Sequence, residues 1–166
     1  PWEELKEKTI LISGGSGFLA SFFAKVFLEA GRKYELNLSL VLVIRNKNSS
    51  LARLKDYLGL DNLIIYYHDI SLPFSDSFPS ADFYIHAASQ ASPKYYFSDP
   101  VGTLKANSLG TSFLLDSAVR SNAKKFLFLS GGETYGVVGE DTKDVDEHGY
   151  GYLDPMQIRS CYAESK

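Results

Sequence analysis

Tyr162 and Lys166 are the residues whose types and spacing most directly predict chemistry. Residues four apart share one face of a helix, so a phenol and an ammonium group can converge on one site. A tyrosine normally has a pKa of about 10, and a neighbouring cation favours the ionised form. Tyr162 could then remove a hydroxyl proton while hydride leaves the same carbon for a nicotinamide ring. The alternative for this pair alone is an exposed helix face.

A glycine-rich turn near the N-terminus is the second chemical signal. Gly14 and Gly17 stand between an apolar stretch and an amphipathic one, and Ala20 completes a G-x-x-G-x-x-A spacing. The first glycine permits a tight turn, and the second lets the backbone approach a pyrophosphate at the free N–H groups of a helix start. We expect Gly14, Gly17, Phe18 and Leu19 to bind a dinucleotide; the alternative is a purely structural turn.

The positions that would meet the adenosine half of such a ligand leave two interpretations open. Arg45 follows the second apolar stretch, where an acidic residue usually binds the ribose. It could stack on adenine or pair with a 2′-phosphate, which would indicate NADP rather than NAD, or lie in a solvated turn. Asp69 and Ile70 follow the third stretch. Asp69 could accept a hydrogen bond from the adenine amino group, or cap the next turn.

The composition limits the class of protein. The 166 residues are 45% hydrophobic and 22% charged, as in one globular domain. A net charge of −3 offers no basic face for nucleic acid. One cysteine excludes an internal disulfide, and the three histidines lack a metal-ligand spacing. With no apolar run of membrane-spanning length and no secretory signal, we expect a cytoplasmic protein with no membrane partner and no metal.

Strand and helix patterns alternate along the chain. Short, nearly continuous apolar stretches predict buried strands at residues 9–13, 38–45, 63–68, 82–87 and 125–130. Helical spacing covers residues 18–30, 50–58 and 99–121. This alternation predicts an α/β fold, a Rossmann doubly wound parallel sheet flanked by helices.

Two of the predicted helices carry end signals. Asp99 and Pro100 are expected to begin the long one, and Gly31 is expected to end the first. The long helix has an apolar stripe that includes Leu104, Leu115 and Val119.

These motifs together resemble the extended short-chain dehydrogenase/reductase family, which acts on nucleotide sugars. The resemblance covers essentially the whole chain, because three segments match besides the glycine turn and the Tyr-Lys pair. They are His86-Ala87-Ala88-Ser89, Asn107-Ser108-Leu109-Gly110-Thr111 and Ser130-Gly131-Gly132-Glu133-Thr134-Tyr135-Gly136. The resemblance implies that NAD is lined by Ala87, Ala88, Ser89, Asn107, Tyr162 and Lys166.

Two further segments are similar to the UDP-glucuronate decarboxylase group of that family. They are Ala91-Ser92-Pro93-Lys94-Tyr95-Tyr96 and Arg159-Ser160-Cys161-Tyr162-Ala163-Glu164-Ser165-Lys166. The resemblance implies a nucleotide-sugar substrate bound by Ser92, Tyr95, Glu133 and Arg159. Nucleotide-sugar 4-epimerases and 4,6-dehydratases are the nearest alternatives.

The same resemblance implies a reaction sequence. Tyr162 would deprotonate the sugar 4-hydroxyl as hydride passes from C4 to NAD, while Lys166 binds the nicotinamide ribose and lowers the pKa of Tyr162. The resulting 4-keto sugar is a β-keto acid, which loses carbon dioxide before hydride returns. Glu133 would help to position the sugar ring or a proton; the alternative for Glu133 is a structural acid.

The chain departs from the family at two glycines. Gly131 replaces a serine or threonine that hydrogen-bonds the reacting hydroxyl. Ser130 is a catalytic candidate beside it, although adjacent side chains at a strand end point in opposite directions. Gly132 stands where 4,6-dehydratases carry an acid, which disfavours dehydration. The glycine pair either brings substrate closer to the backbone or marks reduced activity.

The organisation of the whole protein follows from the same comparison with the family. Residues 1–166 are expected to be the NAD(P)-binding domain of a longer enzyme, an N-terminal fragment that lacks most of the substrate domain. A homodimer is expected through a bundle of the helix from Asp99 and the helix near Arg159. The acidic run at 141–147 is a solvated loop or a flap over the sugar. The alternative of another class is a non-catalytic dinucleotide-binding module.

Overall fold

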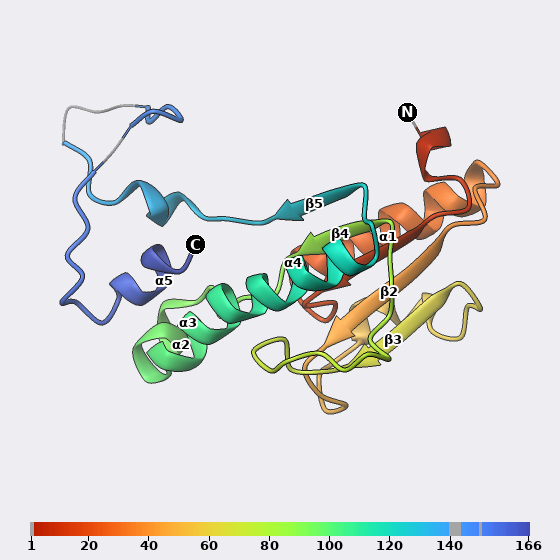
Figure 1. The fold of residues 1–166 in the computed structure, drawn as a ribbon, viewed down its shortest axis with the longest axis horizontal. Helices are drawn as coiled ribbons and strands as arrows, with labels where there is room; N and C mark the ends of the chain where they lie inside the picture. Colours follow the sequence, from red (N-terminus) through yellow and green to blue (C-terminus); the bar gives the residue numbers. More distant parts are fainter. Residues whose placement is uncertain (1, 140–143, 150) are drawn as a thin grey trace.

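The computed structural model describes residues 2–139, 144–149 and 151–166. Five parallel strands form one sheet in the order β3-β2-β1-β4-β5 (Figure 1). They are β1 Thr9–Ser13, β2 Ser39–Ile44, β3 Leu63–Tyr67, β4 Phe83–His86 and β5 Lys125–Phe128. All five predicted strands are confirmed, and this order is that of the Rossmann fold. Successive strands are added on one side of β1 up to β3 and on the other side from β4 onward, so the strand order reverses between β1 and β4. A crevice is expected at the carboxyl ends of these two strands.

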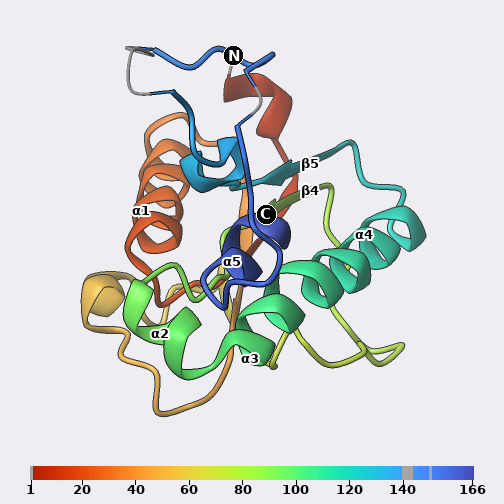
Figure 2. The ribbon, with the colours of Figure 1, turned by 90° about the vertical axis from the view of Figure 1, so that its left-hand side faces the viewer.

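Helices cover both faces of the sheet. Figure 2 shows α1 on one side of the strands and α4 on the other. The α-helices are α1 Phe18–Lys33, α2 Pro93–Ser98, α3 Pro100–Leu104, α4 Gly110–Arg120 and α5 Ser160–Glu164. Shorter turns are the 3₁₀ helices η1 Trp2–Leu5, η2 Ala52–Tyr57 and η4 Gly132–Tyr135, and the π-helix η3 Lys105–Leu109. No described helix has the combined length and hydropathy to span a membrane.

The two cores follow from the two-residue period of a strand. Ile10 and Ile12 of β1 pack with α1 on one face, whereas Leu11 packs with Leu114 of α4 on the other. Each strand of the sheet centre therefore carries apolar residues on both sides. This is why the strands read as continuous apolar runs in the sequence.

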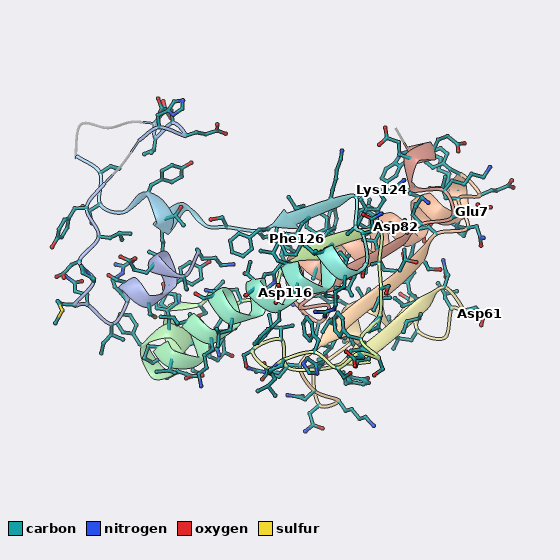
Figure 3. The ribbon with its side chains drawn as sticks, in the orientation of Figure 1. Glu7, Asp61, Asp82, Asp116, Lys124 and Phe126 are labelled. Carbon is teal, nitrogen blue, oxygen red and sulfur yellow. The ribbon has the colours of Figure 1, made fainter. Side chains whose placement is uncertain are left out.

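The amino ends of the strands are tied together at Asp82, far from the carboxyl-end crevice. Asp82 accepts a hydrogen bond from Thr9 N at 2.9 Å through its carboxylate, and another from Lys124 N at 2.7 Å through its carbonyl. Figure 3 shows Asp82 and Lys124 beside each other at the end of the sheet remote from α5. These hydrogen bonds fix the register of β1, β4 and β5 at the amino ends of the strands.

The predicted long helix is present as a continuous course through α3, η3 and α4. Asp99 caps it as expected, accepting a hydrogen bond from Gly102 N at 2.9 Å, and Pro100 is its first residue. The predicted helix at 50–58 is the 3₁₀ helix η2. The short helix α2, which starts at Pro93, was not predicted because six residues provide too little periodicity.

The expected end of α1 at Gly31 is wrong. The helix continues to Lys33 with Tyr34 as its C-cap, and Glu35 instead takes the left-handed conformation with φ of 51°. Leu36 N donates to Gly31 O at 3.0 Å, so the chain reverses by hydrogen bonds that satisfy the last carbonyls. Gly31 is buried within the helix, and a Cβ there would contact Leu38.

The expected apolar stripe of the long helix does not face the core. Leu104, Leu115 and Val119 are 44%, 42% and 80% exposed. The buried residues of α4 are instead Gly110, Leu114, Ser117 and Ala118, and Leu114 is the large apolar side chain among them. A Cβ added to Gly110 would lie 2.8 Å from Ile70 Cδ1, so a larger residue would crowd the segment after β3. The acidic run at 141–147 falls partly outside the described residues, so the flap interpretation is not addressed for 141–143.

Candidate active site

The carboxyl ends of β1 and β4 are joined by the buried hydroxyl of Ser13. Its oxygen accepts hydrogen bonds from Ala87 N and Ala88 N, both at 3.2 Å, and lies 2.7 Å from Nδ1 of His86. A hydroxyl has two acceptor positions and one proton. Because both acceptor positions are filled by main-chain N–H groups, the Ser13 proton is donated to Nδ1 of His86. This arrangement places the His86 proton on Nε2.

His86 is fully buried and neutral at physiological pH. Burial lowers the pKa of its imidazole to about 4, and the positive charge of Lys166 acts in the same direction. A main-chain interaction with Ala106 opposes these effects without reversing them. A protonated His86 could no longer accept the Ser13 proton at Nδ1, so the neutral state is required for the connection between β1 and β4.

The buried imidazole predicts a loss of stability in acid. The pKa of about 4 in the folded state lies below the ordinary value of 6.5, so the unfolded state binds the extra proton first. The unfolding free energy should therefore fall by up to about 3 kcal/mol as the pH decreases from about 6.5 to about 4. Chemical unfolding measured across this range checks it. His86→Asn should remove this component, whereas His148→Asn, at an exposed position, should retain it; equal pH dependence in the two variants would contradict the assignment.

The glycine turn has the geometry of a pyrophosphate cradle. Gly14 has a φ of 75°, and a Cβ there would lie 2.7 Å from Ala88 Cα. Gly17 is the N-cap of α1 and provides no side-chain cap to the first-turn N–H groups. Those donors and the positive end of the helix dipole suit an anion. Phe18 and Leu19, which begin α1, are exposed beside the turn. These residues fit a bound dinucleotide phosphate.

Gly14→Ala is expected to destabilise the protein and to abolish dinucleotide binding. The added Cβ would strain a left-handed backbone position and collide with the segment after β4. We expect a loss of roughly 2 kcal/mol or more in unfolding free energy. Gly132→Ala is the matched control, because a Cβ there has no neighbour within 4 Å. Equal stability of the two variants in chemical unfolding would contradict the assignment.

The residues expected at the adenosine end of a dinucleotide follow β2 and β3 at the carboxyl edge of the sheet: Arg45, Asp69 and Ile70. Arg45 is exposed directly after β2. Asp69 Oδ1 accepts hydrogen bonds from the main-chain N–H and the hydroxyl of Ser71 at 3.0 and 2.8 Å, which is the capping alternative. The Ile70 side chain is buried against Gly110, which leaves its main chain for a ligand.

Tyr162 lies on α5 with 8% of its surface exposed, and its ring centroid is 5.3 Å from that of Tyr96. A Cβ added to Gly131 would lie 3.1 Å from the Tyr162 hydroxyl, so this glycine forms the floor under the phenol. Burial raises the pKa of Tyr162, the Glu133 carboxylate raises it further, and the Ser89 hydroxyl lowers it. The expected effect of Lys166 on the pKa of Tyr162 stays a prediction.

Lys166 is positioned by the end of β5 rather than by Tyr162. Its Nζ donates to Leu129 O at 2.7 Å and lies 4.8 Å from the centre of the Phe128 ring. The distance from Nζ to the centre of the Tyr162 ring is 5.9 Å. Burial lowers the pKa of Lys166 to about 8. Both members of the pair are thus shifted toward their neutral forms.

The α5 helix is held in place by Asn107 of the π-helix. Asn107 Nδ2 donates to Ser165 Oγ at 2.9 Å, and Ser165 Oγ donates to Cys161 O at 2.6 Å. Asn107 is fully buried. Expected as a cofactor residue, Asn107 is connected to the segment that carries Tyr162 through this chain of hydrogen bonds.

The expected substrate residues divide into two groups. Glu133 lies 3.7 Å from Arg159 between charged atoms and accepts a hydrogen bond from Tyr96 at 3.3 Å. A cavity of about 180 Å³ adjoins this cluster. Ser92 and Tyr95, by contrast, are exposed at the start of α2.

The Ser130 side chain is not brought to the phenol. Its hydroxyl donates to Lys166 O at 3.3 Å, and Gly131 occupies the position beneath Tyr162. The alternation of side chains at the end of β5 explains this, and a catalytic role of Ser130 stays a prediction.

Ser13 and Tyr96 are site residues that the sequence did not identify. Ser13 ends a predicted strand just before the glycine turn, and this position was its only signal. Tyr96 follows Tyr95, and without the bounds of α2 the sequence could not say which of the two tyrosines is buried.

A sheet of this order, with a glycine turn after β1, Tyr162 on α5 and Lys166 just after that helix, defines a dinucleotide-binding Rossmann domain of the extended short-chain dehydrogenase/reductase type. A family model described as "NAD dependent epimerase/dehydratase family" matches residues 10–166. The chain belongs to the NAD-dependent epimerase/dehydratase family.

Two relatives illustrate the similarity in sequence. UDP-glucuronic acid decarboxylase 1 of Danio rerio is 32% identical over 164 residues, which cover 98% of this chain and 36% of that protein. UDP-glucuronic acid decarboxylase 6 of Arabidopsis thaliana is 34% identical over 160 residues, covering 95% and 43%. The chain therefore spans less than half the length of the curated relatives it matches.

Solved structures agree in fold. The UDP-glucose 4-epimerase of Thermotoga maritima, determined with UDP-glucose, superimposes with a TM-score of 0.71 at 24% identity, covering 95% of this chain and 47% of that one. The UDP-glucose 4-epimerase of Thermus thermophilus, in complex with NAD, gives 0.70 at 23% identity, covering 95% and 47%. At these identities the likeness concerns the fold.

Proposed function

We propose that the full-length protein binds NAD and decarboxylates UDP-glucuronate through oxidation of the sugar C4 hydroxyl. The observation that carries the proposal is the placement of Tyr162: a buried phenol at the carboxyl edge of the sheet, above Gly131 and beyond the glycine turn. The relatives named for UDP-glucuronic acid decarboxylation support the choice of substrate.

In this proposal the cofactor lies across the crevice with its pyrophosphate at Gly14 and Gly17. Phe18, Leu19, the main chain of Ile70, and the segment Ala87-Ala88-Ser89 border it. NAD, when bound, accepts hydride from C4 of the sugar and later returns it. Arg45 lies where it could stack on adenine or meet a 2′-phosphate, so NADP remains the alternative. Comparing NAD and NADP affinities of Arg45→Ala separates these two roles.

Tyr162 then acts as the base for the C4 hydroxyl. Its proton must leave before the phenol can accept another, and Lys166 stands near enough to stabilise the charge that forms. Glu133 and Arg159 face the 180 Å³ cavity from one side, where they can orient a sugar ring and its carboxylate. Ser92 and Tyr95 contribute contacts from α2. Once C4 is a ketone, the C5 carboxylate is a β-keto acid and can leave as carbon dioxide.

Tyr162→Phe tests whether the site is catalytic. The substitution keeps the ring packed against Tyr96 but removes the ionisable oxygen, so turnover of UDP-glucuronate should fall roughly 100-fold or more while NAD binding persists. Carbon dioxide release by the full-length protein measures this. Tyr34→Phe, at the C-cap of α1, should keep full activity.

Unchanged carbon dioxide release in Tyr162→Phe would contradict the assignment of Tyr162 as the base. The alternative of a non-catalytic dinucleotide-binding module predicts no turnover in either protein, with cofactor affinity and biological effect unchanged in Tyr162→Phe. If wild-type protein releases no carbon dioxide, analysis of products from UDP- and dTDP-hexoses distinguishes a 4-epimerase from a 4,6-dehydratase.

The exposed apolar residues of α3 and α4 support a homodimer through a helix bundle. Val119 and Leu115 lie on α4 away from the sheet. Val119→Lys should place a charge in the proposed interface and shift the full-length protein from dimer to monomer in light scattering. Leu58→Lys, which follows η2, is the control and should not change the mass. A wild-type protein that is monomeric at micromolar concentration would refute the dimer.

A further inference from the structure

Gly131 leaves the Tyr162 hydroxyl without a side-chain partner from β5. The other polar groups in this part of the site already donate hydrogen bonds elsewhere. Tyr96 donates its hydroxyl to Glu133, Lys166 Nζ donates to Leu129 O, and Ser130 donates to Lys166 O. The Glu133 carboxylate disfavours ionisation of the phenol. A base at Tyr162 therefore needs a hydrogen-bond donor from another element.

Ser89 carries such a donor. Its Oγ is buried and has no hydrogen-bond partner within the described part of the chain. A buried hydroxyl without a partner is costly and calls for an explanation. The Ser89 hydroxyl lies beside the phenol and lowers the pKa of Tyr162, against the effects of burial and Glu133.

The backbone that presents Ser89 is held in place. Ser13 Oγ accepts the N–H groups of the two preceding residues, and Ala88 packs directly against Gly14. Ser89 is thus positioned by β1 and β4, whereas Tyr162 is positioned by α5 and Asn107. The two hydroxyls come from segments that are fixed independently of each other.

We propose that Ser89 is a positioning residue for Tyr162, whose hydroxyl donates a hydrogen bond to the ionised phenol and replaces the hydroxyl that Gly131 lacks. With the phenol protonated, the two oxygens do not satisfy hydrogen-bond geometry; ionisation supplies the charge that draws the donor into line. This role rests on the proposed function of Tyr162 as a base. It adds to, and does not depend on, the expected contact of Ser89 with the cofactor.

The test is Ser89→Ala in the full-length protein, with ionisation of Tyr162 as the first readout. Tyrosinate absorbance is titrated in each variant and in the same variant carrying Tyr162→Phe, and the difference isolates Tyr162 without any substrate. The apparent pKa of Tyr162 should rise by about one unit, and the pH–rate profile should move to higher pH with a roughly tenfold lower kcat at neutral pH.

Two variants separate this role from a structural one. Ser89→Thr keeps the hydroxyl and should retain the wild-type titration. Gly131→Ser in the Ser89→Ala background should restore it, because its Cβ would lie 3.1 Å from the phenolic oxygen. Ser98→Ala, at an exposed serine of α2, should change nothing. If Ser89→Ala does not fold, Ser89→Cys, nearly isosteric and a weak donor, replaces it.

An unchanged Tyr162 titration in folded Ser89→Ala protein would overturn the proposal, whatever the activity. A shifted titration in a protein that does not turn over UDP-glucuronate would support the role of Ser89 and reject the proposed substrate. The two failures are therefore distinguishable.

Discussion

The bonding of one buried hydroxyl, that of Ser13, underlies the whole arrangement. Parallel strands are joined by ladders of main-chain hydrogen bonds, but these end where the strands end. At the carboxyl edge the chain after β4 must turn away while staying close to the glycine turn. Beyond the last hydrogen bonds between the strands, the Ser13 hydroxyl continues the connection. It accepts the main-chain N–H groups of Ala87 and Ala88 and donates to His86. A crevice that opens between two strands is in this way closed at its base.

That constraint has consequences for the glycine turn. With Ala88 held against it, the turn has no room for a Cβ at Gly14, and α1 begins at a fixed distance from β4. The free N–H groups of α1 and the segment after β4 then face the same crevice. A second tie, Asn107 to Ser165, brings α5 to this edge from 58 residues further along the chain. Each tie is buried and polar, so each specifies one geometry more strictly than apolar packing would.

Much of the fold could be read from the sequence because its signals are local. Five apolar runs correspond to five strands, and the cap at Asp99 fixed the start of the long helix. The face of that helix could not be predicted, because spacing identifies apolar residues without showing what covers them: Leu115 and Val119 are exposed, whereas Leu114 is in the core. The end of α1 was missed for a related reason. Glu35 adopts a conformation that usually indicates glycine, and nothing in its side chain announces this.

The sequence motifs predicted which residues form the site, but not how the structure shifts the ionisation of Tyr162 and Lys166. Spacing alone suggests that Lys166 makes Tyr162 acidic, yet burial opposes a charge on either residue. The residues of α5 do not offset this cost of burying a charge, since they offer neither a carbonyl to the Lys166 ammonium nor a hydrogen-bond donor to the Tyr162 phenol. Leu129 at the end of β5 supplies the carbonyl, and Ser89 after β4 stands where a donor is needed. The reactivity of the pair is therefore a property of the sheet edge beneath it, and a tyrosine and lysine four residues apart on an isolated helix would not reproduce it.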